Sequence, residues 1–202
     1  MTSPLRLELF IDAQNTYRSA RRSFFSPNAL PVNGQFNPRR LGEIVAERSR
    51  PGGAACILHD VRIYTGRPDP EKDSRTYAAH MRQCDAWEAA GARVISRPLR
   101  YPRGWPAERA QEKGVDIALA IDFVTMAIER EYDVGVIMST DTDLRPALEF
   151  TSRRSEVRQA AVAAWRGASR RQRLAIPGAN LWCHWLDRDD YDAVADPTSY
   201  AR

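Results

Sequence analysis

Residues 132–144 read YDVGVIMSTDTDL, and this stretch decides the fold class of the chain. Its first part, from Asp133 to Ser139, is almost wholly apolar and predicts a buried strand, which Asp141 and Asp143 follow directly. Near-continuous apolar strands are typical of parallel sheets covered by helices on both faces. In such sheets ligands bind at the carboxyl ends of the strands. The two acids therefore stand where a functional site is expected.

Strand and helix patterns alternate on both sides of this stretch. We expect further strands at residues 5–11, 56–64, 93–96, 157–164 and 181–186, and helices at 16–25, 41–50, 74–90, 115–130 and 143–153. Gly91 is expected to end the helix before it, and residues 97–113, rich in proline, to form an exposed loop or hairpin. The order predicts one three-layer α/β/α domain over residues 1–195, with a mainly parallel sheet and a tail at 196–202.

The composition excludes several classes of protein. A chain of 202 residues with 43% hydrophobic and 28% charged residues is typical of one globular domain rather than a disordered protein. Its net charge of +4 permits a polyanionic ligand, but 28 of its 30 basic residues are arginine, a skew that coding bias explains. Three scattered cysteines predict neither disulfides nor a zinc site and favour a cytoplasmic setting. We expect no signal peptide and no membrane span.

Acidic residues end two of the expected strands and begin one helix. Asp12 ends the first strand, and if that strand neighbours 133–139, its carboxylate comes within a few Å of Asp141 and Asp143, because adjacent strands lie about 4.8 Å apart. Asp116 shares one helix face with apolar residues, whereas Asp122 is expected to face solvent or another element. Converging carboxylates are the ligands that Mg²⁺ or Mn²⁺ requires.

Each polar residue at these positions also has a local explanation. Asp141 or Asp143 can cap the next helix, and Asp12 can stabilise a turn. Asp116 can complement the dipole of its helix, while Asn15 is either a substrate ligand or a helix N-terminal residue. Both readings of each residue stay open at the level of sequence.

Three motifs resemble the NYN domain family, the LabA-like branch of PIN-like nucleases. They are FIDAQN at residues 10–15, KGVDIALAID at 113–122 and YDVGVIMSTDTDL at 132–144, within a similarity that extends over residues 5–150. The resemblance implies a PIN-like domain that binds Mg²⁺ or Mn²⁺ and hydrolyses RNA phosphodiester bonds. Asp12, Asp116, Asp141 and Asp143 match the acidic positions of the family, with Asn15 and Ser139 beside them. Ala13 and Thr140 stand where the family usually has glycine, and we expect their bulkier side chains either to narrow the site or to alter the approach of the substrate.

The resemblance also implies RNA as the partner. We expect Lys113 and Thr140 to lie near the substrate, and Arg100 and Arg103 to contact phosphates from a loop that also carries Tyr101 and Trp105. A solvated loop is the alternative. The clusters Arg153-Arg154 and Arg170-Arg171-Gln172-Arg173 are weaker signals. PIN-like domains often dimerise, so a homodimer is compatible with the resemblance.

Other functions remain to be weighed against a metal-dependent ribonuclease. The main alternative is a non-catalytic RNA-binding or regulatory module, which Ala13 and Thr140 favour. A haloacid-dehalogenase-like phosphatase would need an acid where this chain has Gln14, and a nucleotide-sugar transferase rests on Asp141-Thr142-Asp143 alone. The histidines have no spacing that predicts a nucleophilic triad, and a glycine-rich phosphate fingerprint is absent from the sequence.

Overall fold

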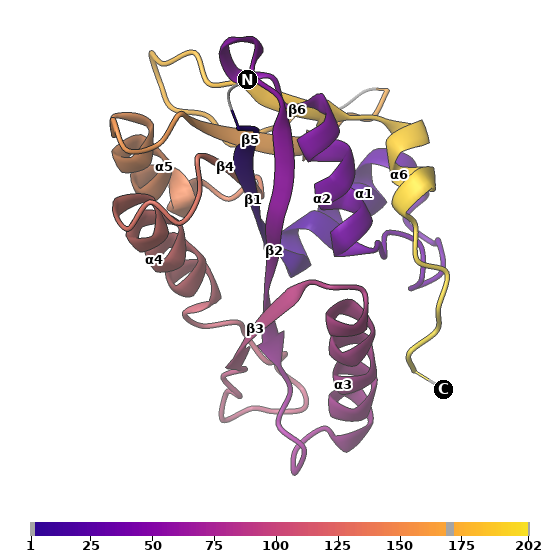
Figure 1. The fold of residues 1–202 in the computed structure, drawn as a ribbon. Coiled ribbons are helices and arrows are strands. Elements are labelled where there is room, and N and C mark those ends of the chain that lie inside the picture. The colour runs from indigo at the N-terminus through magenta and orange to yellow at the C-terminus, as the bar shows by residue number, and fades with distance from the viewer. Residues whose placement is uncertain (1–2, 169–171, 202) are drawn as a thin grey trace.

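The computed structural model describes residues 3–168 and 172–201 (Figure 1), so Arg170 and Arg171 of the weaker basic cluster lie outside it. The strands are β1 (Leu5–Asp12), β2 (Cys56–Arg67), β3 (Arg93–Pro98), β4 (Val134–Met138), β5 (Gln159–Trp165) and β6 (Cys183–Leu186). The helices are α1 (Ala13–Phe24), α2 (Pro38–Arg48), α3 (Ser74–Ala89), α4 (Val115–Ile128), α5 (Arg145–Ser152) and α6 (Arg188–Val194). Two short 3₁₀ turns are η1 (Pro51–Gly53) and η2 (Thr142–Leu144).

The described strands form one six-stranded parallel sheet in the order β3-β2-β1-β4-β5-β6. Strands β2 and β3 are added in order on one side of β1, and β4 then pairs with β1 on its other side. Ile11 pairs with Met138, so the expected neighbours β1 and β4 end side by side. This reversal of strand order is the position at which open α/β sheets bind their ligands.

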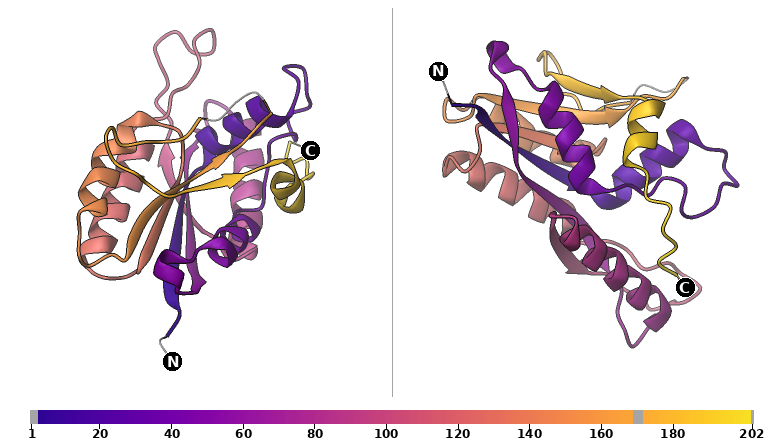
Figure 2. Two further views of the ribbon diagram at one scale, coloured as in Figure 1. Left: turned by 90° about the horizontal axis from the view of Figure 1, so that it is seen from above. Right: turned by 45° about the vertical axis from the view of Figure 1, so that its right-hand side comes forward.

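Helices cover both faces of the sheet (Figure 2). On one face Leu7, Leu9 and Ile11 of β1 pack in a core with residues of α1, α2, α3 and α6. On the other face Phe10 packs against Phe123 of α4 in a second core that includes α5. Alternate residues of β1 thus enter opposite cores, as the two-residue period of a strand requires. The predicted three-layer α/β/α fold is confirmed.

Several element boundaries differ from those expected from sequence. Helix α1 begins at Ala13 rather than near residue 16, because Asp12 ends the strand and caps the helix at once. The expected helix at 143–153 is divided into η2 and α5, with Pro146 in the first turn of α5. Helix α6 was not expected. The feature that could have indicated this helix is a capping box, in which Asp187 and Asp190 bond reciprocally to each other's backbone N–H groups.

The expected loop at 97–113 is a hairpin-like excursion. Arg100 and Gln111 exchange two backbone hydrogen bonds of 2.8 and 2.9 Å, which close the base of the loop. Gly91, with φ of 90°, follows α3 as predicted. Among the described helices, none combines the length and the apolar character that crossing a membrane would need.

Candidate functional site

Asp12 stands at the carboxyl end of β1 with 4% of its surface exposed. One carboxylate oxygen accepts the backbone N–H of Asn15 at 3.0 Å, and the other accepts the hydroxyl of Ser139 at 3.1 Å. Both donors are neutral. Burial raises the pKa of Asp12 to about 6, and the carboxylates of Asp116 and Glu112 add to the rise. Asp12 therefore caps α1, where the sequence suggested a turn, and it also lies near the acids Asp116 and Glu112.

The loop after β4 carries the next two acids. The backbone N–H of Asp141 donates to the Ser139 hydroxyl at 3.1 Å, so Ser139 connects this loop to Asp12. Asp141 in turn accepts the backbone N–H of Asp143 at 3.0 Å and caps η2. The capping role that sequence allowed for Asp141 is thus present, while the Asp143 side chain is left exposed.

Asp116 lies in the first turn of α4 and is half-buried. Burial raises its pKa, and the negative charges of Asp141 and Asp143 raise it further. Gly114, with φ of 78°, precedes the helix in the left-handed conformation that glycine adopts at low cost. The structure therefore couples Asp116 electrostatically to Asp12 on one side and to the acids after β4 on the other.

Glu112 is a member of this acidic group that sequence reasoning missed. Its carboxylate accepts the backbone N–H of Gly66 at 2.8 Å, at the end of β2. Burial raises its pKa, with Asp116 adding to the rise and Arg18 opposing it. A Cβ at Gly66 would clash with the side chains of Leu99 and Glu112, so glycine permits this approach. Its position four residues before Asp116 was the available signal.

Asn15 and Thr140 join α1 to the loop after β4. The amide oxygen of Asn15 accepts both the backbone N–H and the hydroxyl of Thr140, each at 3.0 Å. Glycine at position 140 could not supply the second bond. The two residues expected near the substrate are thus brought together, with the Asn15 oxygen already engaged.

The basic residues expected to contact substrate lie on exposed surface. Lys113 lies two residues before the start of α4, and Arg100 and Arg103 lie on the loop closed by Gln111. In that loop the rings of Tyr101 and Trp105 meet edge to face at 4.8 Å, and the Tyr101 hydroxyl accepts the backbone N–H of Asp69 at 3.0 Å. The aromatic pair therefore helps to fix the loop against the segment that carries Asp69, while both arginines face solvent.

The donor chemistry of the acidic group fits a hard divalent cation, because it consists of carboxylates that raise one another's pKa values. Within residues 3–168 and 172–201, however, no three Asp, Glu, His or Cys side chains gather closely enough to hold one ion. Asp122 lies apart, as expected: it accepts the Tyr64 hydroxyl at 2.8 Å and faces Arg62.

Comparison with known proteins identifies the family of the chain. The model of the NYN domain matches residues 6–175. The chain is 25% identical over 205 residues to 6-hydroxy-3-succinoylpyridine 3-monooxygenase HspA of Pseudomonas putida (strain DSM 28022 / S16), a match that covers 84% of this chain and 62% of that protein. The chain thus spans less than two thirds of the length of this curated relative.

A solved structure shares the fold. The protein of unknown function VPA0982 from Vibrio parahaemolyticus RIMD 2210633 superposes with a TM-score of 0.51 at 15% identity, over 81% of this chain and 84% of that one. At this identity the likeness concerns the fold alone.

Proposed function

Since the chain belongs to the NYN domain family, within the PIN-like nuclease superfamily, we propose that it hydrolyses RNA phosphodiester bonds with the help of Mg²⁺ or Mn²⁺. The observation that carries the proposal is the acidic group at the carboxyl ends of β1 and β4, where Asp12 is buried beside other carboxylates and bonds only to neutral donors. Such an arrangement is unfavourable by itself and becomes favourable when a cation joins it.

Asp12, Asp116, Asp141 and Asp143 are the residues that would hold the ion. A divalent ion held by these residues would supply Lewis-acid chemistry, activating water and offsetting the charge of the phosphate. The chain's own contribution is to orient the acids: Ser139 donates to Asp12 and accepts from the backbone of Asp141, so one hydroxyl sets the position of both. Reorganisation of the side chains on metal binding is required, because no three of them converge in the described residues.

Arg100, Arg103 and Lys113 would bind the phosphates of the RNA strand. All three are exposed, and they lie on the segment that leads directly into Asp116. Arginine suits phosphate because its planar guanidinium group can donate two parallel hydrogen bonds. Positive charge on this segment would partly offset the repulsion between the strand and the acidic group.

Cleavage of a panel of RNAs by the purified protein tests the proposal. We expect cleavage with Mn²⁺ or Mg²⁺ that a chelator abolishes, and a loss of at least about tenfold in Asp141→Asn, or roughly 1.4 kcal/mol of barrier. Asp189→Asn, on the exposed surface of α6, is the matched control and should cleave like the wild type. Equal cleavage by Asp141→Asn and the wild type would remove Asp141 from the mechanism.

A second candidate is a non-catalytic RNA-binding module on the same fold. The bonds between Thr140 and Asn15 favour it, because they occupy an amide oxygen beside the acidic group. The discriminating result is RNA binding without cleavage of any RNA in the panel, whatever the metal.

The salt dependence of RNA binding tests the loop arginines under either candidate. Replacing Arg100 and Arg103 with alanine should weaken binding and lower the slope of log affinity against log salt by about 2, since each phosphate contact releases about one counterion. Arg153→Ala is the control, because Arg153 is exposed between α5 and β5, on the other side of β1 from β3, which the loop follows. An unchanged slope in the double variant would show that the loop is ordinary solvated surface.

A further inference from the structure

A groove of about 470 Å³ lies on the surface of α1, the helix that Asp12 caps. Seven residues line it: Tyr17, Arg18, Arg21, Arg22 and the segment 25–27. None of these residues is acidic, so its three arginines make the groove positively charged. A concave surface lined by charge of one sign concentrates ligands of the opposite sign. The groove therefore suits an anion.

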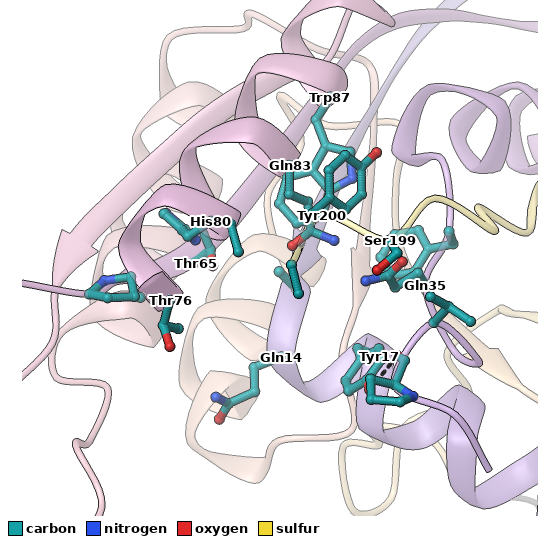
Figure 3. A pocket seen from close by; sticks show the side chains of 18 of the residues that line it. Gln14, Tyr17, Gln35, Thr65, Thr76, His80, Gln83, Trp87, Ser199 and Tyr200 are labelled. Carbon is teal, nitrogen blue, oxygen red and sulfur yellow. Dashed lines mark hydrogen bonds between the residues drawn. The ribbon is translucent and has the colours of Figure 1, made fainter. Parts of the chain in front are cut away.

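One of the three arginines shapes the groove. The guanidinium group of Arg21 donates to three backbone oxygens of the segment 29–33, at 2.6 to 2.8 Å, and fixes that segment against α1. The Tyr17 hydroxyl adds to this by donating to the backbone oxygen of Pro31 at 2.8 Å (Figure 3). Arg21 and Tyr17 are thus engaged within the protein.

The other two arginines, Arg18 and Arg22, are exposed and form no ion pair within the part of the chain that the structure describes. Ion pairs do engage eight other arginines: Arg6, Arg39, Arg48, Arg62, Arg93, Arg154, Arg166 and Arg188. Arg22 lies in the last turn of α1, where the helix dipole favours a positive charge, but Arg18 lies in the middle of the helix. Two guanidinium groups are therefore open to a ligand.

These two arginines continue a face of α1 that starts at the acidic group. Asn15, Arg18 and Arg22 share one face, because they are spaced by three and four residues. Asn15 accepts two hydrogen bonds from Thr140, in the loop that carries the acids after β4. The positive charge of Arg18 opposes the rise in the pKa of Glu112. Arg22 lies about 6 Å further along the helix, a spacing close to that of successive phosphates in a nucleic-acid strand.

Tyr17 also lines a cavity of about 380 Å³ between α1 and α3, which has the opposite character (Figure 3). Glu112 is the carboxylate of its described lining, which includes neither arginine nor lysine. A phosphate in that cavity would meet Glu112 without a compensating cation. The phosphates of a strand are therefore expected in the groove rather than in the cavity.

We propose that Arg18 and Arg22 bind phosphates of the RNA strand on one side of the bond held at the acidic group. The inference rests on the proposed function and extends it. The arginines of α1 follow Asp12 in the chain, whereas Arg100 and Arg103 precede Asp116, so two separate segments would hold the strand. Contacts to phosphates carry no base information, so this contribution is independent of RNA sequence.

Anisotropy of a labelled single-stranded RNA of about 12 nucleotides, titrated in chelator at several salt concentrations, measures binding without metal-dependent cleavage. Arg18→Ala combined with Arg22→Ala should weaken binding at least about tenfold and lower the slope of log affinity against log salt by up to about 2. The loss should be the same for oligouridine and oligoadenosine. Lysine at both positions should keep most of the slope, since counterion release depends on the charge.

Arg153→Ala combined with Arg158→Ala is the charge-matched control. It removes two exposed positive charges between α5 and β5 and should leave the slope nearly unchanged. An equal loss in both double variants would reduce the effect to net charge and overturn the proposal, as would an unchanged slope in the α1 variant. Weaker binding of inorganic phosphate by the α1 variant, with RNA binding intact, would also overturn it. Failure of the proposed ribonuclease is a separate result, because it appears as RNA that is bound but not cleaved when metal is added.

Discussion

Strand β1 carries two buried acids, Glu8 and Asp12, on the same face and about 13 Å apart along the strand. Glu8 is fully buried and accepts the guanidinium Nε of Arg62 at 2.8 Å in an ion pair. Asp12 is almost as buried, but its hydrogen-bond donors are a backbone amide and a serine hydroxyl, and its charged neighbours are carboxylates.

The difference separates a structural charge, Glu8, from the charge that we propose binds a cation, Asp12. Burial raises the pKa of Glu8, but the hydrogen bond and positive charge of Arg62 oppose the rise. Burial raises the pKa of Asp12 as well, and there the neighbouring acids add to it. An acid in the interior of a sheet needs its cation in the fold, whereas an acid at the carboxyl end of a strand can take one from solution.

The largest expected effect comes from removing the cation of the structural pair. Arg62→Met should lower the free energy of unfolding by about 3–5 kcal/mol, because it leaves Glu8 as an uncompensated buried charge. Urea denaturation monitored by circular dichroism measures it. The double variant Glu8→Met with Arg62→Met is the control and should recover most of the loss. If the double variant is no more stable than Arg62→Met, packing rather than charge explains the effect.

Asp12→Asn should act in the opposite direction. In chelator at pH 7 it should raise the free energy of unfolding by up to about 3 kcal/mol, since the folded pKa is about 6, the unfolded value is about 4, and each unit is worth about 1.4 kcal/mol. Asparagine can still cap α1.

The pH dependence of stability tests the sign of this difference between Asp12→Asn and the wild type. The folded wild type holds its Asp12 proton more tightly than the unfolded chain, so its stability falls as pH rises from about 4 to 6. The gap between Asp12→Asn and the wild type should therefore open across that window and be absent below it. A variant that is less stable than the wild type at pH 7 would make Asp12 a structural acid like Glu8.

Metal should close most of the stability gap between the two proteins. At a Mn²⁺ concentration of about 100 times Kd, binding should stabilise the wild type by about 2.7 kcal/mol, and Asp12→Asn should lose most of this gain. Melting curves with Mn²⁺ and with chelator measure the difference. Glu8→Gln serves as the control, because loss of an acid away from the site should leave the Mn²⁺ shift intact. Equal Mn²⁺ shifts in the wild type and Asp12→Asn would exclude Asp12 as a ligand.

The smallest expected effect concerns the neutral contacts beside Asp12. Thr140→Val removes the hydroxyl bond to Asn15 but keeps the backbone bond and the side-chain volume, and should lower the free energy of unfolding by about 1 kcal/mol. Thr142→Val, at an exposed position of η2, should change it less. A null result at Thr140 would mean that the hydroxyl bond contributes nothing net to joining α1 and the loop after β4.

The sequence by itself determined the fold class and the place of the acids. The apolar run at 133–139 and the alternation of strands with helices suffice for a covered parallel sheet, because a strand buried on both faces must be apolar throughout. Asp12, Asp141 and Asp143 could be assigned to strand ends from the same pattern. Helix α6 was not predicted from the sequence, because it is short and begins among charged residues.

Only the tertiary structure decided what surrounds each acid. Glu8 and Asp12 are both single acids in an apolar strand, and no local pattern reveals that Arg62 faces one of them and carboxylates face the other. Glu112 joins the site through Gly66, a contact between residues 46 positions apart. Partners of this kind are set by strand order and packing, which bring together residues that the chain keeps apart.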